Sequence, residues 1–308
     1  MWTPPFRRLV APARRRPGLP RLLASMALVA ALWFAAVLGV LGLAAAVAGP
    51  EDGAAWQARI AAGETPTGVL LLLATFGGLA GGGALALRLL HGRTAASLLG
   101  PAPARRFAGA AILCLLVSGA AGLALAAPVP LVPGTPLGLF LSFLPCALVA
   151  LALQTGAEEL VFRGLLQTQL AARFASPLVW MGLPSVLFGL LHWSPEAGAN
   201  APLVVLVTAL FGLLAADLTR VTGGIAAAWG LHFANNALAV LVVSLDGPLS
   251  GLALWRLPFG AEAEGLPLLL AQDALLMAIV WAVIRLWLAR DPAQQAATDE
   301  DAPSPDGA

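Results

Sequence analysis

Two adjacent carboxylates and an arginine interrupt an apolar part of the chain, which reads TGAEELVFRGLLQ over residues 155–167. Glu159 and Arg163 are four residues apart on a predicted helix, so their side chains can form an ion pair. A salt bridge that fixes helix packing is the simpler interpretation of these two. Glu158 points about 100° away around the helix and cannot easily share Arg163. It is the carboxylate without a local counter-charge, and therefore the candidate general base.

Two of the three histidines lie in apolar segments further along the chain. Phe188 and His192 are four residues apart in FGLLH, and His232 and Asn236 are four residues apart in HFANN, so each pair shares a helical face. Ionisable side chains at membrane depth cost about 2.5–3.5 kcal/mol each on insertion scales, and they usually mark function. These residues and the two glutamates therefore predict a buried catalytic or ion-binding site.

This set of side chains suits hydrolysis of an amide by an activated water molecule. Glu158 would accept a proton from the water, and His192 would help to hold that water. His232 and Asn236 would donate hydrogen bonds to the carbonyl oxygen as it becomes negative, and one such donor is worth about 2.7–4 kcal/mol. Nucleophilic catalysis fits less well, because no serine or cysteine at membrane depth has a clearly matched histidine.

Metal ligation is the alternative use of the same groups. Glu158, His192 and His232 with one open position would make a catalytic zinc set. The usual H-E-x-x-H pattern is absent, although ligands could converge from three helices. Spacing does not decide between the two chemistries.

The elements that must position these residues are membrane helices. The chain is 59% hydrophobic and 11% charged, with a mean hydropathy of +0.87, whereas a soluble domain carries about 25% charged residues. Uncharged runs of about 18 or more residues are typical of transmembrane helices. We therefore predict an all-α, polytopic membrane helical bundle with the active site inside the bundle. The lipid bilayer is an expected partner, and nucleic acid is not.

About eight transmembrane helices are predicted, and they cover residues 22–48, 67–88, 107–127, 137–168, 178–194, 202–218, 224–245 and 266–288. The chain divides into a disordered Arg-rich cytoplasmic tail (1–21), N-terminal transmembrane helices (22–136), a catalytic core (137–245), an outer loop with the last transmembrane helix (246–290) and a disordered acidic tail (291–308).

Arginine placement orients this bundle. With the N-terminus in the cytoplasm, 14 of the 17 basic residues fall on or near the cytoplasmic side, Arg59 and Arg256 face out, and Arg163 lies within a helix. Such a bias follows the positive-inside rule and predicts that both termini are cytoplasmic.

Other features are expected to be structural. The pairs Gly77 with Gly81 and Gly78 with Gly82 have the spacing that lets helix backbones approach closely. His91 is expected in a cytoplasmic loop, and Asp273 is expected to be a packing or interfacial residue.

The motifs EELVFRG, FGLLH and HFANN occur in this order and in separate predicted helices. They resemble the EExxxR, FxxxH and HxxxN motifs of the CPBP (Abi) family. That family includes the type II CAAX prenyl endopeptidases and many bacterial relatives, some linked to bacteriocin immunity. The resemblance covers about residues 137–245, and no motif position departs from the pattern.

The resemblance implies an intramembrane endopeptidase that cleaves a peptide or membrane-protein substrate, CAAX-like substrates included. It implies Glu158 as the base, His192 as its partner at the water, His232 and Asn236 as oxyanion donors, and supporting roles for Glu159, Arg163 and Phe188. The family has been called both metalloprotease and metal-independent glutamic protease. The metal-free mechanism is favoured here, with no cofactor and with zinc as the alternative.

Two other classes of function stay open. The fold can serve as a non-enzymatic immunity factor or scaffold, although an intact set of four polar residues argues against that role. An ion or proton transporter would use the same groups as relays. The uniform use of arginine and the composition suggest a bacterial source, which places the protein in the plasma membrane.

Overall fold

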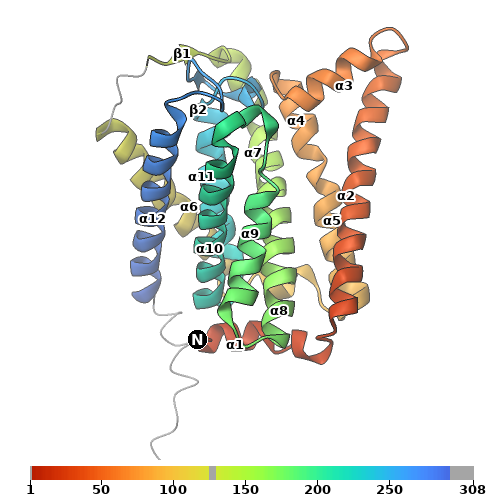
Figure 1. The fold of residues 1–308 in the computed structure, drawn as a ribbon, viewed down its shortest axis with the longest axis vertical. Helices are drawn as coiled ribbons and strands as arrows, with labels where there is room; N and C mark the ends of the chain where they lie inside the picture. Colours follow the sequence, from red (N-terminus) through yellow and green to blue (C-terminus); the bar gives the residue numbers. More distant parts are fainter. Residues whose placement is uncertain (1, 125–129, 292–308) are drawn as a thin grey trace, which may run out of the picture.

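The structure is a computed structural model that describes residues 2–124 and 130–291. It is a bundle of helices that run up and down between two ends (Figure 1). Its α-helices are α1 (Pro4–Val10), α2 (Leu19–Ala48), α3 (Gly53–Ala62), α4 (Pro66–Ala74), α5 (Phe76–Ala86), α6 (Pro103–Ala124), α7 (Leu137–Glu159), α8 (Thr168–Arg173), α9 (Leu183–Leu190), α10 (Ala201–Thr222), α11 (Ala226–Ala237) and α12 (Leu266–Ala289).

Shorter elements join and extend these helices. Wider π-helical turns cover Leu87–His91, Leu160–Gln167, Leu178–Gly182 and Leu238–Val242. Turns of 3-10 helix cover Ala13–Arg15, Ala95–Leu98, Pro195–Asn200 and Ser250–Leu252. Strands β1 (Val132–Pro133) and β2 (Val243–Ser244) pair with opposite edges of β3 (Trp255–Arg256), antiparallel and parallel respectively, and form a small sheet at one end of the bundle.

The predicted all-α membrane bundle is confirmed. Within the described residues, six continuous helical stretches are long and apolar enough to cross a membrane, namely Leu19–Ala48, Pro66–His91, Pro103–Ala124, Leu137–Arg173, Pro195–Thr222 and Leu266–Ala289. Large apolar side chains such as Phe34 and Leu43 on α2 are exposed, as expected of a surface that faces lipid.

The count of eight transmembrane helices is not confirmed. The two remaining predicted spans are helical but short, and they cover Leu178–Leu190 and Ala226–Val242. At about 1.5 Å per residue they extend about 20 Å and 25 Å, less than the hydrocarbon core of about 30 Å. The FGLLH motif lies at the end of the first of these stretches, and the HFANN motif lies in the middle of the second.

The N-terminal segment differs from the disordered tail that we expected for residues 1–21. Thr3 caps helix α1, and its side chain accepts a hydrogen bond from the Phe6 amide at 3.3 Å. Phe6 and Val10 are fully buried, and the Phe6 ring stacks on Trp180 with 4.9 Å between ring centroids. The apolar residues that recur every three to four positions hold the segment against the bundle despite its many arginines. Apart from Asp291, the expected acidic tail lies outside the described residues.

His91 was expected in a loop, and the structure places it in a helix. The π-helical turn Leu87–His91 prolongs the preceding helix by one turn, until Gly92 ends it in a left-handed conformation. The His91 side chain is buried, and its Nε2 is 2.8 Å from the Ser25 hydroxyl oxygen on α2.

Small residues bring the helices together where backbones touch. A Cβ atom at Gly78 would overlap the Leu32 carbonyl oxygen of α2, and one at Gly82 would lie 2.9 Å from the Val29 Cα atom. A Cβ atom at Gly81 would meet nothing within 4 Å. Of the two predicted glycine pairs, the pair that packs against α2 is therefore Gly78 with Gly82.

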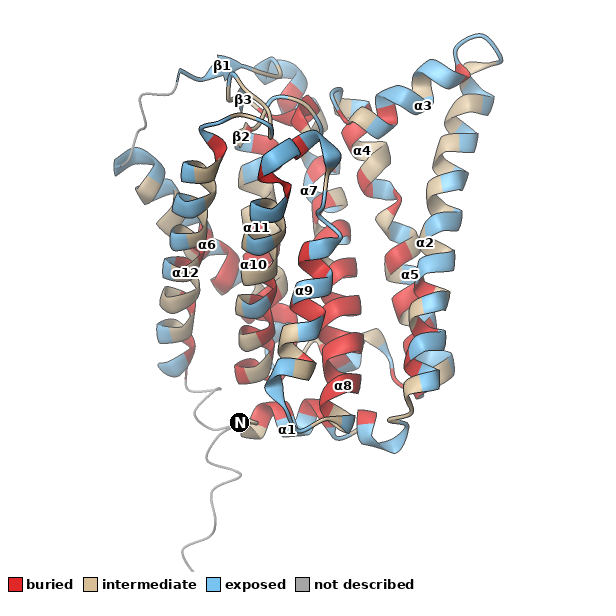
Figure 2. Ribbon diagram, viewed as in Figure 1, coloured by how far each residue is buried: buried red, intermediate tan, exposed pale blue. Residues whose placement is uncertain are grey.

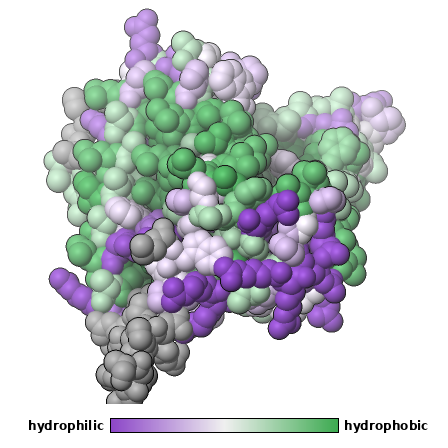
Figure 3. All heavy atoms as spheres, turned by 60° about the horizontal axis from the view of Figure 1, so that its bottom comes forward, coloured by the Kyte–Doolittle hydropathy of each residue, from purple (hydrophilic) through white to green (hydrophobic). Residues whose placement is uncertain are grey.

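Burial is concentrated around the middle of the bundle. Buried residues gather on α7, α8, α10 and α11, while α2, α6 and α12 present exposed outer faces (Figure 2). Helix α1 and the end of α12 lie at the same end of the bundle (Figure 1), and hydrophilic side chains collect on that face below a hydrophobic belt (Figure 3). That this face is cytoplasmic stays a prediction.

The glycine contact between α2 and α5 gives a test of the packing. Gly78→Ala should lower the melting temperature in detergent, because overpacking a tight contact costs about 1–3 kcal/mol. Gly81→Ala is the matched control, and it should leave the melting temperature unchanged or raise it, since alanine favours the helix by up to about 1 kcal/mol. Equal melting temperatures for the two variants would contradict the packing described here.

Candidate active site

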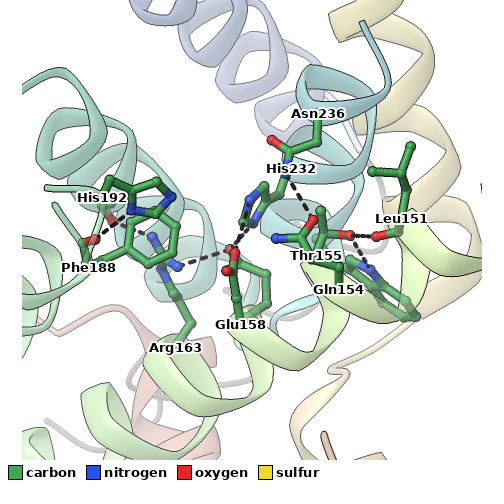
Figure 4. Close-up of polar contacts among 12 residues, drawn as sticks. Leu151, Gln154, Thr155, Glu158, Arg163, Phe188, His192, His232 and Asn236 are labelled. Atoms are coloured by element: carbon green, nitrogen blue, oxygen red, sulfur yellow. Dashed lines mark hydrogen bonds and ion pairs between the residues drawn. The ribbon is translucent and has the colours of Figure 1, made fainter. Parts of the chain in front are cut away.

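The structure brings the motif residues together at one place in the bundle. It collects Glu158 from the end of α7, Arg163 from the π-helical turn that follows, His192 from the turn after α9, and His232 and Asn236 from α11 (Figure 4). Glu159 follows Glu158 as the last residue of α7. A π-helical turn adds a residue to each turn and is frequent at functional sites. Here it follows directly on the two glutamates.

Glu159 lies at the centre of the buried charges. Its Oε1 atom accepts hydrogen bonds from Arg163 at 3.0 Å and from His232 Nδ1 at 2.8 Å. Arg163 also donates to the Gly212 carbonyl oxygen at 3.3 Å, and its guanidinium lies 4.6 Å from the centre of the Phe188 ring. The predicted ion pair between Glu159 and Arg163 is confirmed, and Glu159 has a second partner that the sequence did not predict.

His232 lies between the two carboxylates. A carboxylate can only accept, so the contact with Glu159 fixes a proton on Nδ1 and leaves Nε2 on the side of Glu158. His232 Nε2 is 3.4 Å from Glu158 Oε2, and that oxygen has no hydrogen-bond partner within the described residues. His232 can therefore donate through Nε2 only when it carries two protons.

The buried charged groups of the site contact one another. Glu159 contacts both Arg163 and His232, and Glu158 contacts His232. A hydrogen-bonded group of ions is the form in which a low-dielectric interior tolerates charge.

His192 was expected inside a membrane helix, and the structure places it in the turn just after α9, where it is exposed. The helix ends at Leu190, before the histidine is reached. His192 Nδ1 is 2.8 Å from the Phe188 carbonyl oxygen. A carbonyl oxygen also only accepts, so Nδ1 carries the proton and Nε2 is left to accept a hydrogen bond.

Phe188 makes aromatic contacts with both histidines of the site. Its ring is buried and lies 4.9 Å from the His192 ring and 5.8 Å from the His232 ring, centroid to centroid. Phe211 also packs against His232, at 4.8 Å, and its ring lies 6.0 Å from the Phe188 ring. The aromatic residue of the FxxxH motif therefore fixes the positions of both histidines.

Gln154 is a site residue that the sequence reasoning missed. It is buried, and its side-chain oxygen accepts a hydrogen bond from Asn236 at 3.0 Å. It also contacts the Glu158 carboxyl group. Gln154 lies four residues before Glu158, so its spacing on the helix was the signal that could have identified it.

Hydrogen bonds and close packing hold helices α7 and α11 together beside these residues. The Trp229 indole nitrogen donates to the Ala152 carbonyl oxygen at 3.1 Å and lies 3.2 Å from the Thr155 hydroxyl. A Cβ atom at Gly156 would lie 2.9 Å from the Trp229 ring. Gly156 thus leaves space for the Trp229 indole. The indole fixes the position of α11 along α7, and therefore the position of His232 beside the glutamates.

A cavity of about 150 Å³ adjoins the two histidines. It is lined by Phe188, His192, Val207, Thr208, Phe211, His232, Asn235, Asn236, Asp273 and Met277. Water occupies about 30 Å³ per molecule in the liquid, so the cavity has room for several water molecules. Asp273 was expected to be a packing or interfacial residue, but α12 places it in the cavity wall.

The alternative zinc set does not assemble in this geometry. Among the described residues, no three histidine, cysteine, aspartate or glutamate side chains are placed to hold a metal ion. His232 faces the two carboxylates through both ring nitrogens. We therefore derive no step through a metal.

Comparisons with known proteins agree with the motifs. Residues 139–238 match the family model described as type II CAAX prenyl endopeptidase Rce1-like, which confirms the predicted resemblance. The chain is 30% identical over 150 residues to the uncharacterized protein YyaK of Bacillus subtilis (strain 168), an overlap of 48% of this chain and 49% of that protein. The chain thus spans about half the length of this relative. No solved structure matches significantly.

The shared acceptor role of Glu159 gives a test of the site. Glu159→Gln should strongly lower the melting temperature, because removing one partner of a buried ion pair costs about 3–5 kcal/mol. Glu158→Gln is the matched comparison, and its effect should be smaller because Glu158 contacts His232 at the longer distance of 3.4 Å and makes no ion pair with Arg163. Equal destabilisation by the two changes would contradict the central position of Glu159.

Proposed function

We propose, from the premise that residues 139–238 form a domain of the Rce1-like type II CAAX prenyl endopeptidase family, that this protein is an intramembrane endopeptidase. It hydrolyses a peptide bond in a membrane-associated substrate, CAAX-like substrates included. Glu158 activates the water, and no metal takes part. The observation that supports this best is the position of His232, which lies between two carboxylates and in the wall of a cavity large enough for water.

The first half of the reaction is the attack of water on the carbonyl carbon. Glu158 takes one proton from the water as the new C–O bond forms. His192 accepts a hydrogen bond from the same water through Nε2, since its Nδ1 proton is held by the Phe188 carbonyl oxygen. General base catalysis of this kind is worth about 10²–10⁴ in rate.

The second half depends on donors to the oxyanion. The protonated His232 donates through Nε2, and Glu159 stabilises its positive charge from the other side of the ring. The amide of Asn236, oriented by Gln154, supplies a second donor. When the C–N bond breaks, Glu158 returns its proton to the leaving amine, which restores the carboxylate and balances the protons.

Cleavage by the purified protein tests this proposal. Detergent-purified wild type, Glu158→Gln and Glu196→Gln would be incubated with a prenylated CAAX peptide and a panel of apolar peptides, with and without a strong chelator. Glu196 is exposed on the loop before α10, so it offers the same chemical change outside the site. We expect wild type and Glu196→Gln to cleave in chelator, and Glu158→Gln to be about 10²–10⁴-fold slower.

Each other outcome has a distinct meaning. Loss of cleavage in chelator would replace the metal-free mechanism with a metal-dependent one. Full activity of Glu158→Gln would remove Glu158 from the role of base. Absence of any product across the panel, together with ion flux in proteoliposomes, would favour the transporter, and absence of both would favour an immunity or scaffold protein.

We place the protein in a bacterial plasma membrane with both ends of the chain in the cytoplasm. Topology reporters test this orientation. Green fluorescent protein fused after Ala308 should fluoresce, and alkaline phosphatase at that position should be inactive. The two reporters should give the reverse result in the loop between α2 and α3, which lies at the end of the bundle opposite α1 and the last turn of α12 (Figure 1). Fluorescence at both positions would contradict the arrangement.

A further inference from the structure

Arg93 is a buried cation outside the candidate active site. It lies between the spans Pro66–His91 and Pro103–Ala124, and its side chain is 6% exposed. Neither its Nε atom nor one of its terminal nitrogens has a hydrogen-bond partner within the described residues. A buried guanidinium without such partners destabilises the folded state. Natural structures seldom leave that cost uncompensated, so a missing partner is expected.

The side chains near Arg93 add to its unbalanced positive charge. Arg16, Arg21 and Arg93 all act electrostatically on the buried His91. No carboxylate of residues 2–124 or 130–291 lies within ion-pair distance of Arg93. Burial lowers the pKa of Arg93 to about 10, which still leaves the side chain charged at neutral pH. The part of the chain that the structure describes thus provides a local excess of positive charge.

A pocket of about 390 Å³ opens beside Arg93. Its walls come from the N-terminal segment through Arg8, Leu9 and Pro12, from the connection between two spans through Arg93 and Ser97, and from Gly223 after α10. Three parts of the chain that are far apart in sequence therefore enclose one hollow with arginine side chains in its wall. Arginine is the residue that suits phosphate best, since its planar donors match two phosphate oxygens.

The position of the pocket points to the source of the anion. Arg93 follows the end of one span by two residues, and the pocket is shared with α1, which lies across one end of the bundle (Figure 1). Hydrophilic side chains collect on this face below the hydrophobic belt (Figure 3). That is the depth at which lipid headgroups meet a membrane protein, and basic pockets at such a position bind anionic headgroups.

We propose that the pocket formed by α1, Arg93 and the turn at Gly223 binds the phosphate group of an anionic phospholipid. The headgroup supplies the counter-charge that Arg93 lacks, and it joins the N-terminal segment to the connection between two spans. The site is separate from the candidate active site, and the proposal does not depend on the proposed function.

Thermal unfolding of the full chain in neutral detergent tests the proposal. Phosphatidylglycerol, phosphatidylcholine or inorganic phosphate would be titrated into wild type, Arg93→Gln, Arg93→Lys and Arg88→Gln. Arg88 is exposed on the preceding helix, so it controls for the loss of one positive charge. A ligand that binds the folded state raises the melting temperature.

We expect phosphatidylglycerol to raise the melting temperature of wild type and Arg88→Gln more than phosphatidylcholine does. The half-saturating concentration should be roughly tenfold higher or more in Arg93→Gln, since a charged hydrogen bond is worth about 1.5–3 kcal/mol. Arg93→Lys should recover part of the response. An equal response of Arg93→Gln and wild type would overturn the site.

Two further outcomes concern the source of the anion and the case in which the Arg93→Gln variant does not fold. A full response to inorganic phosphate alone would overturn a lipid as the ligand and leave a free anion. If Arg93→Gln does not fold, native mass spectrometry of the wild type decides the question. Retention of phosphatidylglycerol in preference to phosphatidylcholine supports the proposal, and equal retention of both lipids overturns it.

Discussion

The oxygen atom Oε1 of Glu159 accepts hydrogen bonds from Arg163 and from His232 at the same time. One atom thereby connects the π-helical turn after α7 to the middle of α11, at a depth where an unpaired charge is expensive. Arg163 extends the connection to α10 through the Gly212 carbonyl oxygen and to α9 through the Phe188 ring. The relative positions of four helices therefore depend on a single carboxylate.

The small residues make this connection possible. Charged side chains of this kind reach one another only if the backbones that carry them approach closely. A Cβ atom at Gly212 would lie 2.9 Å from Ser185 on α9, and one at Gly230 would overlap the Phe107 carbonyl oxygen on α6. Close backbone contact, rather than apolar side-chain burial, is the means by which helices associate in lipid. The glycines and the buried ions are thus parts of one arrangement.

The sequence predicted what depends on local spacing and on hydropathy. The ion pair between Glu159 and Arg163 is an i, i+4 contact, and the long apolar spans follow from composition. It did not predict that Glu159 also binds His232, because the two are 73 residues apart and their contact depends on how α7 and α11 pack.

The predictions from sequence were wrong where the composition of a segment points to one structure and its tertiary contacts impose another. Residues 1–21 contain enough arginine to suggest a tail, yet Phe6 and Val10 are buried against the bundle. His91 lies in a helix because a π-helical turn extends that helix beyond its expected end. His192 lies outside a helix because α9 ends at Leu190, two residues before the histidine.

Helix α12 contributes Asp273 and Met277 to the cavity wall, although it lies outside the segment that matches the family, residues 139–238. Most of the wall therefore comes from the matched segment, which also carries the motif residues, and α12 adds one side of it from outside that segment. Substitutions in α12 can alter the shape and charge of the cavity without changing any motif residue. Two proteins with identical motifs can consequently differ in what the cavity admits, and a fragment limited to the matched segment would retain the motif residues but leave the cavity open on one side.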